Sequence, residues 1–311
     1  MRGATVTHQP TSVLLVPHAG RAANINSAAV AARMMREAGI AVRILINPEN
    51  KTIASHPVLR KFPSVTHGPG AVEGIDLVFV TGGDGTFLRA ADLAYFAQLP
   101  VLGINLGHIG FLAEWEKDSL EEAVLRVISG DYRIEERMTL NISALGPAGE
   151  PLGSGWALNE LSVENQTRTG VLDAILDIDG RPVSSYGCDG IIVSTPTGST
   201  AYAFSAGGPV LWPELDAILV VPNNAHALFT KPLVVAPGST VAIESSASSH
   251  PAYAVMDGFR TIELPPGFRV EIRRGQQGIQ WVRLDDRPFT DRLVSKLKLP
   301  TQGWRGPIQT R

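Results

Sequence analysis

The chain has 311 residues, of which 44% are hydrophobic and 18% charged, so it can bury large cores and is not a disordered chain. The formal net charge of −3 excludes the broad basic surface that nucleic-acid binders normally carry. Apolar runs are too short for a membrane span of roughly 20 residues, and the one cysteine, Cys188, allows no internal disulfide, so we expect a cytoplasmic protein without membrane contact.

The first 137 residues alternate short apolar runs with segments of helical composition. Ser27 is a suitable N-cap for the first helix and Gly39 a suitable stop, while the proline- and glycine-containing stretch 51–74 is expected to be loop with a short helix. Strands are predicted at 12–17, 41–46, 75–81 and 100–105, and helices at 28–38, 87–96 and 120–128. Apolar strands between helices predict a doubly wound α/β domain over residues 1–137, with a mostly parallel sheet covered on both faces.

The pattern changes to short strands separated by turns after residue 137. Strands are predicted at 138–145, 156–164, 171–178, 190–195, 240–246, 252–256 and 268–273. Few helical stretches interrupt them, so residues 138–285 are predicted to form a mainly antiparallel β domain. Residues 290–297 have helical spacing, and the C-terminal segment 286–311 is expected to return to the first domain.

A glycine-rich loop, Gly82-Gly83-Asp84-Gly85-Thr86, joins the predicted strand at 75–81 to the next helix. Ligands of open α/β sheets bind at this end of the strands, and helix N-termini favour anions such as phosphate. A carboxylate repels phosphate, so Asp84 indicates either a ligand for a divalent cation or a base that takes a proton from an attacking hydroxyl. Thr86 is placed to cap the helix or to donate to a phosphate oxygen. A plain tight turn with Asp84 as the helix cap explains the loop equally well.

Other motifs narrow the choice of function. The P-loop, the GxGxxG dinucleotide fingerprint, the HExxH zinc motif and the GxSxG elbow are all absent from the sequence. Several segments, in this order along the chain, instead resemble the NAD kinase family: GGDGT at 82–86, GINLGHIGFL at 103–112, Asn159-Glu160, Cys188-Asp189-Gly190, STPTGSTAY at 194–202 and SAGG at 205–208. GGDGT is shared with diacylglycerol and sphingosine kinases, whereas TPTGSTAY and the Asn-Glu pair are much more specific.

The resemblance implies a reaction and its requirements. NAD kinases transfer the terminal phosphoryl group of ATP, or of inorganic polyphosphate, to the 2′-hydroxyl of the adenosine ribose of NAD, which gives NADP. The resemblance further implies a divalent cation, Mg²⁺ in the first place. It also implies that NAD and ATP are the ligands and that the chain forms a homodimer or homotetramer.

The resemblance also implies a role for individual residues. Asp84 corresponds to the proton acceptor, Gly85 lies against the nucleotide, and Gly82, Gly83 and Thr86 complete the phosphate loop. Contacts with NAD are implied for Arg89 near phosphate, Phe111 and Leu112 at the adenine, Asn159 and Glu160 at the adenosine, Asp189 near the nicotinamide, and Thr200, Ala201, Tyr202 and Ser205 along the dinucleotide.

Two other functions remain open from the residues alone. A lipid or other small-molecule kinase would use the same GGDGT loop, but the TPTGSTAY and Asn159-Glu160 segments disfavour it. A dinucleotide-binding sensor without catalysis is disfavoured by Asp84, because a pure binder has little use for a carboxylate beside phosphates.

Overall fold

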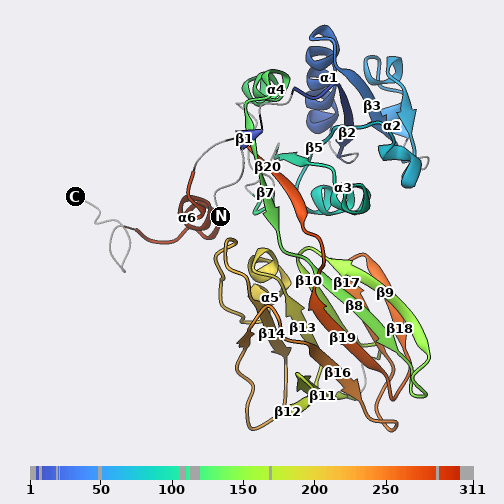
Figure 1. The fold of residues 1–311 in the computed structure, drawn as a ribbon, viewed down its shortest axis with the longest axis vertical. Coiled ribbons are helices and arrows are strands. Elements are labelled where there is room, and N and C mark those ends of the chain that lie inside the picture. Colours follow the sequence, from blue (N-terminus) through green and yellow to red (C-terminus); the bar gives the residue numbers. More distant parts are fainter. Residues whose placement is uncertain are drawn as a thin grey trace. The chain divides into compact units, whose positions relative to one another are not determined.

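The computed structural model describes residues 5–6, 9–18, 20, 22–47, 51–105, 110–112, 120–167, 170–284 and 287–301. The chain forms two compact units (Figure 1), one built from residues up to Glu136 and from Ile279 onward, the other from Arg137 to Gly278. The boundaries predicted from the sequence are 137/138 and 285/286. The return to the first unit begins earlier because residues 279–283 form a strand of its sheet.

An eight-stranded sheet with the order β1-β7-β20-β6-β5-β2-β3-β4 forms the centre of the first unit. Its strands are β1 (Thr5–Val6), β2 (Ser12–Pro17), β3 (Ala41–Leu45), β4 (Ser64–Val65), β5 (Leu77–Thr81), β6 (Val101–Ile104), β7 (Tyr132–Arg137) and β20 (Ile279–Arg283). β2 pairs in parallel with β3 and β5, and β5 pairs in parallel with β6. The predicted, mostly parallel sheet is confirmed.

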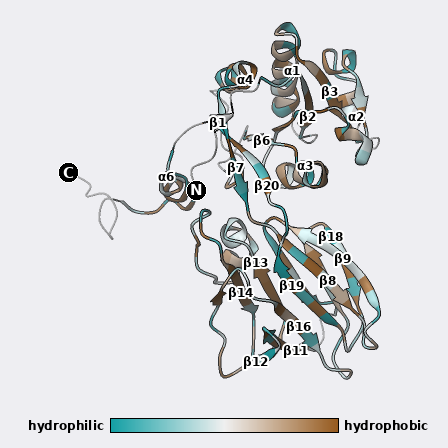
Figure 2. Ribbon diagram, in the orientation of Figure 1, coloured by the Kyte–Doolittle hydropathy of each residue, from teal (hydrophilic) through white to brown (hydrophobic). Residues whose placement is uncertain are grey.

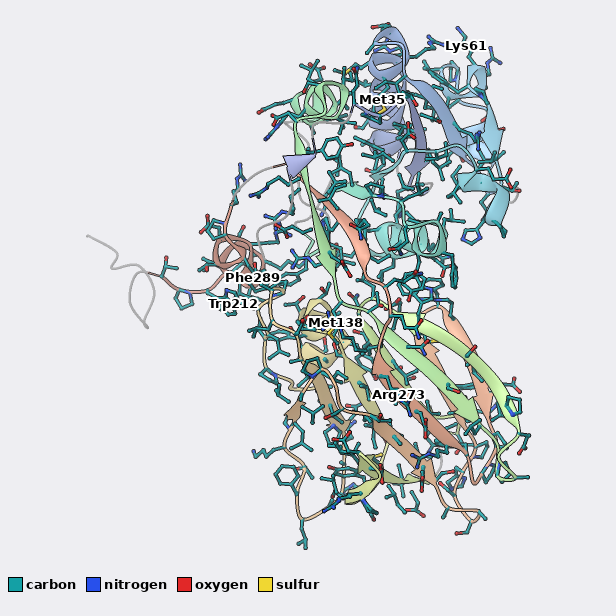
Figure 3. The ribbon with its side chains drawn as sticks, viewed as in Figure 1. Met35, Lys61, Met138, Trp212, Arg273 and Phe289 are labelled. Atoms are coloured by element: carbon teal, nitrogen blue, oxygen red, sulfur yellow. The ribbon has the colours of Figure 1, made fainter. Side chains whose placement is uncertain are left out.

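Helices cover both faces of this sheet. They are α1 (Ala22–Glu37), α2 (Lys51–Ala54), α3 (Asp84–Ala97) and α4 (Leu120–Ser129). A further helix, α6 (Phe289–Leu297), has no buried residue. α1 and α4 share one core cluster with Val13 of β2 and Phe79 of β5. α3 packs against β5 and β6 outside that cluster, and the centre of its Phe87 ring lies 5.0 Å from that of Trp281 of β20. In Figure 3, the labelled Met35 of α1 lies beside the sheet.

The first helix corrects one expectation. α1 begins at Ala22, so Ser27 lies inside the helix and is buried rather than serving as its N-cap. The helix begins before Ser27 because Ile25, two residues earlier, is buried in the core, and this packing outweighs the local preference of serine for a cap. Gly39 does follow the helix with a φ of 85°, as a C-terminal stop requires.

Two six-stranded antiparallel sheets form the second unit, in the orders β15-β14-β13-β10-β17-β18 and β12-β11-β16-β19-β8-β9. The strands are β8 (Leu140–Leu145), β9 (Pro151–Ala157), β10 (Glu160–Asn165), β11 (Leu172–Ile178), β12 (Arg181–Cys188), β13 (Gly190–Ser194), β14 (Ile218–Asn223), β15 (Leu233–Val235), β16 (Val241–Ser245), β17 (Ala252–Met256), β18 (Arg260–Leu264) and β19 (Arg269–Arg274). Their inward side chains share one core, and the apolar residues of β13 and β14 are brown in Figure 2. The predicted antiparallel β domain is confirmed.

The single strand predicted at 156–164 is wrong. The structure has the end of β9 and the start of β10 there, separated by Leu158 and Asn159. This turn places Asn159 and Glu160 at one end of a central strand. Short helices at Thr197–Thr200 and at α5 (Tyr202–Ser205) follow β13 close to it. None of the described helices is long and apolar enough to cross a bilayer.

Candidate functional site

The glycine loop lies where β5 ends and α3 begins. Gly83 is the N-cap residue of α3, and no side chain hydrogen-bonds at this cap. A Cβ on Gly82 would come within 2.8 Å of Thr86 Oγ1, so the loop packs tightly there and accepts only glycine. A Cβ on Gly83 or Gly85 would meet nothing within 4 Å. The backbone is therefore open at these two positions, where an anionic ligand can approach.

Asp84 is the first residue of α3, but its carboxylate does not cap the helix. The backbone N–H of Phe111 donates to Oδ2 at 3.1 Å and that of Leu112 donates to Oδ1 at 3.0 Å. A Cβ on Gly110 would overlap the same carboxylate, so the segment 110–112 closes around it. Each carboxylate oxygen keeps a further lone pair. The interpretation of Asp84 as a helix cap is wrong, and the carboxylate is instead oriented by the segment after β6.

The other predicted residues of the first unit lie on these two segments. Leu112 is buried and Phe111 is half-buried, next to the amides that hold Asp84. Arg89 is exposed on α3, five residues after Asp84. Residues 106–109 of the predicted 103–112 motif lie outside the described residues.

In the second unit, hydrogen bonds hold the Leu158–Asn159 turn from both sides. Asp257, directly after β17, accepts from the backbone N–H of Leu158 at 3.0 Å and of Asn159 at 2.7 Å. At the end of β13, the Thr195 hydroxyl donates to the Leu158 carbonyl at 2.6 Å, and the Ser194 hydroxyl donates to the Asn159 carbonyl at 3.1 Å. All four backbone polar groups of the turn are paired, so its conformation is fixed by the protein itself.

Asp257 is a buried charge with a cationic partner. Arg260 Nη2 lies 2.5 Å from its Oδ2, and the Arg260 guanidinium lies 4.3 Å from the centre of the Trp156 ring. The hairpin between β17 and β18 has positive φ at Asp257 (51°) and Gly258 (74°), typical of an Asp-Gly turn. Asp257 is not identifiable from the sequence, because Asp-Gly between two strands indicates a hairpin but not a carboxylate directed at residue 158.

Two buried side-chain oxygens beside this turn have no hydrogen-bond partner in the described part of the chain. They are Asn159 Oδ1 and Glu160 Oε2. A buried polar atom left unpaired costs about 1–3 kcal/mol, and native structures pair nearly all of them. Two such atoms on adjacent residues of a fixed backbone are typical of a site whose partners come from a ligand.

Burial raises the pKa of Glu160 to about 8, and the negative charge of Asp257 adds to the rise, while a hydrogen bond from the Tyr202 backbone lowers it. Glu160 is therefore mostly protonated at neutral pH and can donate as well as accept. Next to the acceptor and donor atoms of Asn159, this gives a pattern that the edge of a purine or a pair of ribose hydroxyls can match.

This raised pKa has a consequence for stability. The folded state keeps a proton on Glu160 between about pH 4.3 and 8 that the unfolded state releases, so the contribution of Glu160 to stability falls as the pH rises through this window. Glu160→Gln keeps the neutral shape and cannot titrate. We expect the melting temperature of the variant, relative to that of the wild type, to rise as the pH increases from 5 to 8. Thermal unfolding without ligand measures this, with Glu263→Gln on exposed β18 as the control. A difference in melting temperature between Glu160→Gln and the wild type that stays constant with pH would contradict the expectation.

The segment after β13 packs directly on the same turn. A Cβ on Gly198 would overlap the backbone of Asn159, so the glycine of TPTGST is needed for this close approach. The Thr200 hydroxyl donates to the Thr197 carbonyl at 3.3 Å. Ala201 is half-buried and Ser205 is exposed at the end of α5.

Gly198→Ala is expected to displace Asn159 and to destabilise the second unit. Overpacking against a backbone typically costs about 1–3 kcal/mol, and the moved Asn159 should also weaken NAD binding. Chemical unfolding and calorimetric titration with NAD measure the two effects. Gly238→Ala is the matched control, because a Cβ there meets nothing within 4 Å. Equal behaviour of the two variants would show that the turn tolerates the displacement.

Asp189 lies at the other end of β13 from the turn. The five residues of β13 separate it from Thr195, so the two residues lie about 20 Å apart at the rise of a strand. Its carboxylate accepts from the Asn224 side-chain amide at 2.8 Å. The structure therefore does not bring Asp189 into contact with Asn159.

Tyr202 lies between these two ends. Its hydroxyl accepts from the Asn223 side-chain amide at 3.3 Å, next to Asn224. Its pKa is raised by burial and then by the negative charges of Glu164, Asp189 and Glu160. The charges that act on Tyr202 thus come from both ends of β13. The predicted residues of this unit are spread along this strand and do not form a single cluster.

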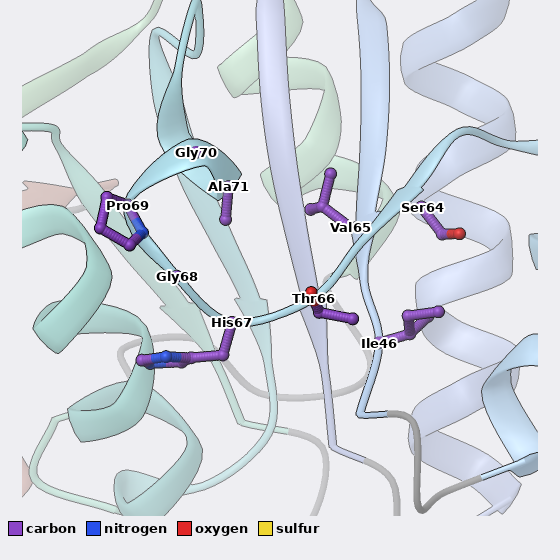
Figure 4. Close-up of a pocket in the computed structure, with 9 residues that line it drawn as sticks. All are labelled: Ile46, Ser64, Val65, Thr66, His67, Gly68, Pro69, Gly70 and Ala71. Atoms are coloured by element: carbon purple, nitrogen blue, oxygen red, sulfur yellow. The ribbon is translucent and has the colours of Figure 1, made fainter.

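A pocket of about 520 Å³ lies beside β3 and β4 and contains none of the predicted residues (Figure 4). Ile46 and residues 64–71 line it, at the same carboxyl edge of the parallel strands as the glycine loop. His67 in its wall lies 3.8 Å from Asp92 of α3. The described residues contain no group of three or more His, Cys, Asp or Glu arranged to hold a metal ion.

Two solved structures share this fold. Yeast NADH kinase in complex with NADH superposes with a TM-score of 0.82 at 21% identity, covering 94% of this chain and 89% of that chain. An NAD kinase from Archaeoglobus fulgidus in complex with ATP superposes with a TM-score of 0.61 at 24% identity, covering 82% and 98%.

Sequence comparisons give closer relatives. NAD kinase of Corynebacterium diphtheriae is 69% identical over 300 residues, which is 96% of this chain and 95% of the relative. NAD kinase of Rhodococcus jostii is 52% identical over 315 residues, which is 98% of each. The family models of the ATP-NAD kinase N-terminal and C-terminal domains match residues 28–132 and 158–284. Since the two models together cover most of the chain and these relatives cover nearly all of it, the chain belongs to the ATP-NAD kinase family.

Proposed function

We propose that the chain transfers the terminal phosphoryl group of ATP to the 2′-hydroxyl of the adenosine ribose of NAD, giving NADP, with Asp84 as general base. The observation that carries the proposal is the Asp84 carboxylate, which stands at the start of α3 and is oriented by two backbone N–H groups instead of capping the helix. Family membership identifies the substrates, and this carboxylate is the group proposed to take the proton of the ribose hydroxyl.

A ribose hydroxyl is a poor nucleophile, so an oriented base within hydrogen-bond reach accelerates its attack. The amides of Phe111 and Leu112 occupy one lone pair on each oxygen of Asp84, which leaves the others to accept the ribose proton. The open backbone at Gly83 and Gly85 and the positive end of the α3 dipole favour the phosphoryl group. Gly82, Thr86 and Arg89 complete the phosphate side of this proposal.

A divalent cation fits this site best as a companion of the donor phosphates. Mg²⁺ in kinases keeps several waters and is bound largely through the substrate phosphates, so the donor phosphates would hold it here while Asp84 stays available as the base. When bound, the cation neutralises charge on the transferred phosphoryl group.

The dinucleotide is proposed to lie along β13. The unpaired oxygens of Asn159 and Glu160 take the adenosine end, and Asp189 takes the nicotinamide end. The spacing of about one strand length suits an extended dinucleotide. The lining between the two ends is assigned to Thr200, Ala201, Tyr202 and Ser205, and the adenine is bordered by Gly85, Phe111 and Leu112.

The test is product formation by the purified full-length chain. NAD, ATP and Mg²⁺ should give NADP whose new phosphate is assigned to the 2′ position by ³¹P NMR, and an NAD analogue with 2′-deoxyadenosine should give none. Replacing ATP by polyphosphate tests the donor, and diacylglycerol or sphingosine tests the lipid-kinase alternative. Tight NAD binding without any turnover would favour the sensor instead and contradict the proposal.

We also propose a cytoplasmic homo-oligomer. The lone cysteine, Cys188, is buried and unpaired, as expected in a reducing compartment. The second unit exposes many large apolar side chains, which suits an interface between copies; they include Tyr202, Phe204, Trp212, Leu215, Leu228, Phe229 and Val234. Light scattering on the purified chain measures the oligomeric state.

A further inference from the structure

The helix α6 lies against the segment that orients Asp84. Phe289, Arg292 and Lys296 share one face of α6, because they are spaced three and four residues apart. All three contact Phe111. The Phe289 and Phe111 rings are 6.3 Å apart, Arg292 Nη1 donates to the Phe111 carbonyl at 3.1 Å, and Lys296 Nζ lies 5.9 Å from the centre of the Phe111 ring. Phe289 is labelled in Figure 3.

The peptide group between Phe111 and Leu112 is hydrogen-bonded on both sides. Its carbonyl accepts from Arg292, and its N–H donates to Asp84 Oδ1 at 3.0 Å. Because the group is planar, a bond at the carbonyl also fixes the direction of the N–H. The positive charge of the donor further polarises the amide, which strengthens the N–H as a donor. Arg292 and Asp84 are thus connected through a single rigid peptide.

Core packing does not explain this arrangement. No side chain of α6 is buried, so the helix contributes little to the hydrophobic core of the first unit. Its three contacts with Phe111 are made by the ring of Phe289 and by two cations, one of which uses its donor on a backbone carbonyl. This distribution suits an element that orients a segment better than one that fills a core.

We infer that Arg292 is a positioning residue for phosphoryl transfer. By holding the peptide of residues 111–112, it fixes the direction in which Asp84 accepts the ribose proton. The inference rests on the proposed role of Asp84 as the base. Small misplacements of a reacting group cost up to about 10²-fold in rate, so the loss of Arg292 lowers kcat and leaves the KM for NAD and ATP nearly unchanged.

The test compares three variants of the full-length chain. Arg292→Met removes the donors but keeps an unbranched side chain, and Arg292→Lys keeps one charged donor. Lys298→Met removes a positive charge from the exposed end of the same helix as the control. We expect kcat to fall about 10- to 100-fold in Arg292→Met, to recover in part in Arg292→Lys, and to stay unchanged in the control. The melting temperatures of all three should agree.

Two further measurements separate positioning from a general structural effect. In an Asp84→Asn background, Arg292→Met should change kcat by less than about twofold, because residues that act as one unit are not additive. Hydrogen exchange of the amides of residues 111 and 112 in the ligand-free protein should be faster in Arg292→Met than in the wild type.

The outcomes distinguish this inference from the function on which it rests. A wild type that forms no NADP, or an Asp84→Asn variant that keeps its turnover, contradicts the proposed function. In that case the hydrogen exchange of the amides of residues 111 and 112 still tests whether Arg292 orients this peptide. A normal kcat with unchanged exchange in Arg292→Met overturns the inference. So does an equal loss of rate in the Asp84→Asn background.

Discussion

Replacing Asp84 with asparagine is expected to lower kcat for NADP formation by about 10²- to 10⁴-fold, the usual contribution of a general base. Asparagine has nearly the same shape but cannot take the ribose proton. It also offers one acceptor oxygen to the two backbone N–H groups of Phe111 and Leu112, so one of them faces an NH₂ group. The segment 110–112 should therefore loosen as well. NAD binding, which the proposal assigns largely to Asn159 and Glu160, should weaken by less than about threefold.

Steady-state kinetics and calorimetric titration with NAD separate the two effects. Asp131→Asn makes the same chemical change at an exposed residue after α4 and serves as the control. Asp84→Ala gives a second reading, since added formate can enter the space of the missing carboxylate and restore part of the turnover. An Asp84→Asn variant with nearly full kcat would show that the proton goes elsewhere.

The location of the glycine loop could be predicted from sequence, whereas the task of Asp84 could not. An apolar strand that runs into glycines is a local signal, and the structure has β5 and α3 on either side of the loop. The choice between a cap and an oriented base depends on Phe111 and Leu112, which are 27 and 28 residues away. The five residues of the loop do not predict where those amides lie.

The break at Leu158 and Asn159 shows the same limit in the second unit. The stretch WALNELSVE contains neither glycine nor proline and reads as one strand. The turn exists because Asp257, 99 and 98 positions away from the two residues, accepts from both of their N–H groups. The Asn-Glu pair could be identified as a site from its resemblance to a family, but its geometry is a product of tertiary contacts.

β20 was missed for a related reason. Residues 279–283 form a short, largely buried strand whose position is set by pairing with β6 of the first sheet. The sequence around it continues the apolar and polar mixture of the preceding β domain. Its neighbours in the sheet, β6 and β7, lie far back in the chain and assign it to the first unit.

Asp257→Ala is expected to lower the free energy of unfolding of the second unit by about 3–5 kcal/mol, the typical result of removing one partner of a buried ion pair. The Asp257 side chain is 1% exposed and that of Arg260 20%, so the remaining guanidinium stays mostly desolvated. The N–H groups of Leu158 and Asn159 lose their acceptor in the same step. NAD binding should weaken with stability, because the turn that presents Asn159 and Glu160 is no longer fixed.

The double variant Asp257→Ala/Arg260→Met tests the origin of this loss. It removes the unpaired charge but not the unpaired N–H groups, and methionine can still pack on Trp156 where the guanidinium now lies. Denaturant unfolding should therefore find the double variant more stable than Asp257→Ala, with NAD affinity still reduced. Arg273→Met, at an exposed pair with Glu271, is the control for removal of a surface charge and should change stability by less than about 1 kcal/mol. If the single and double variants were equally unstable, the loss would come from the turn alone, and the charge pair would be secondary to the two hydrogen bonds that Asp257 accepts from the backbone N–H groups of Leu158 and Asn159.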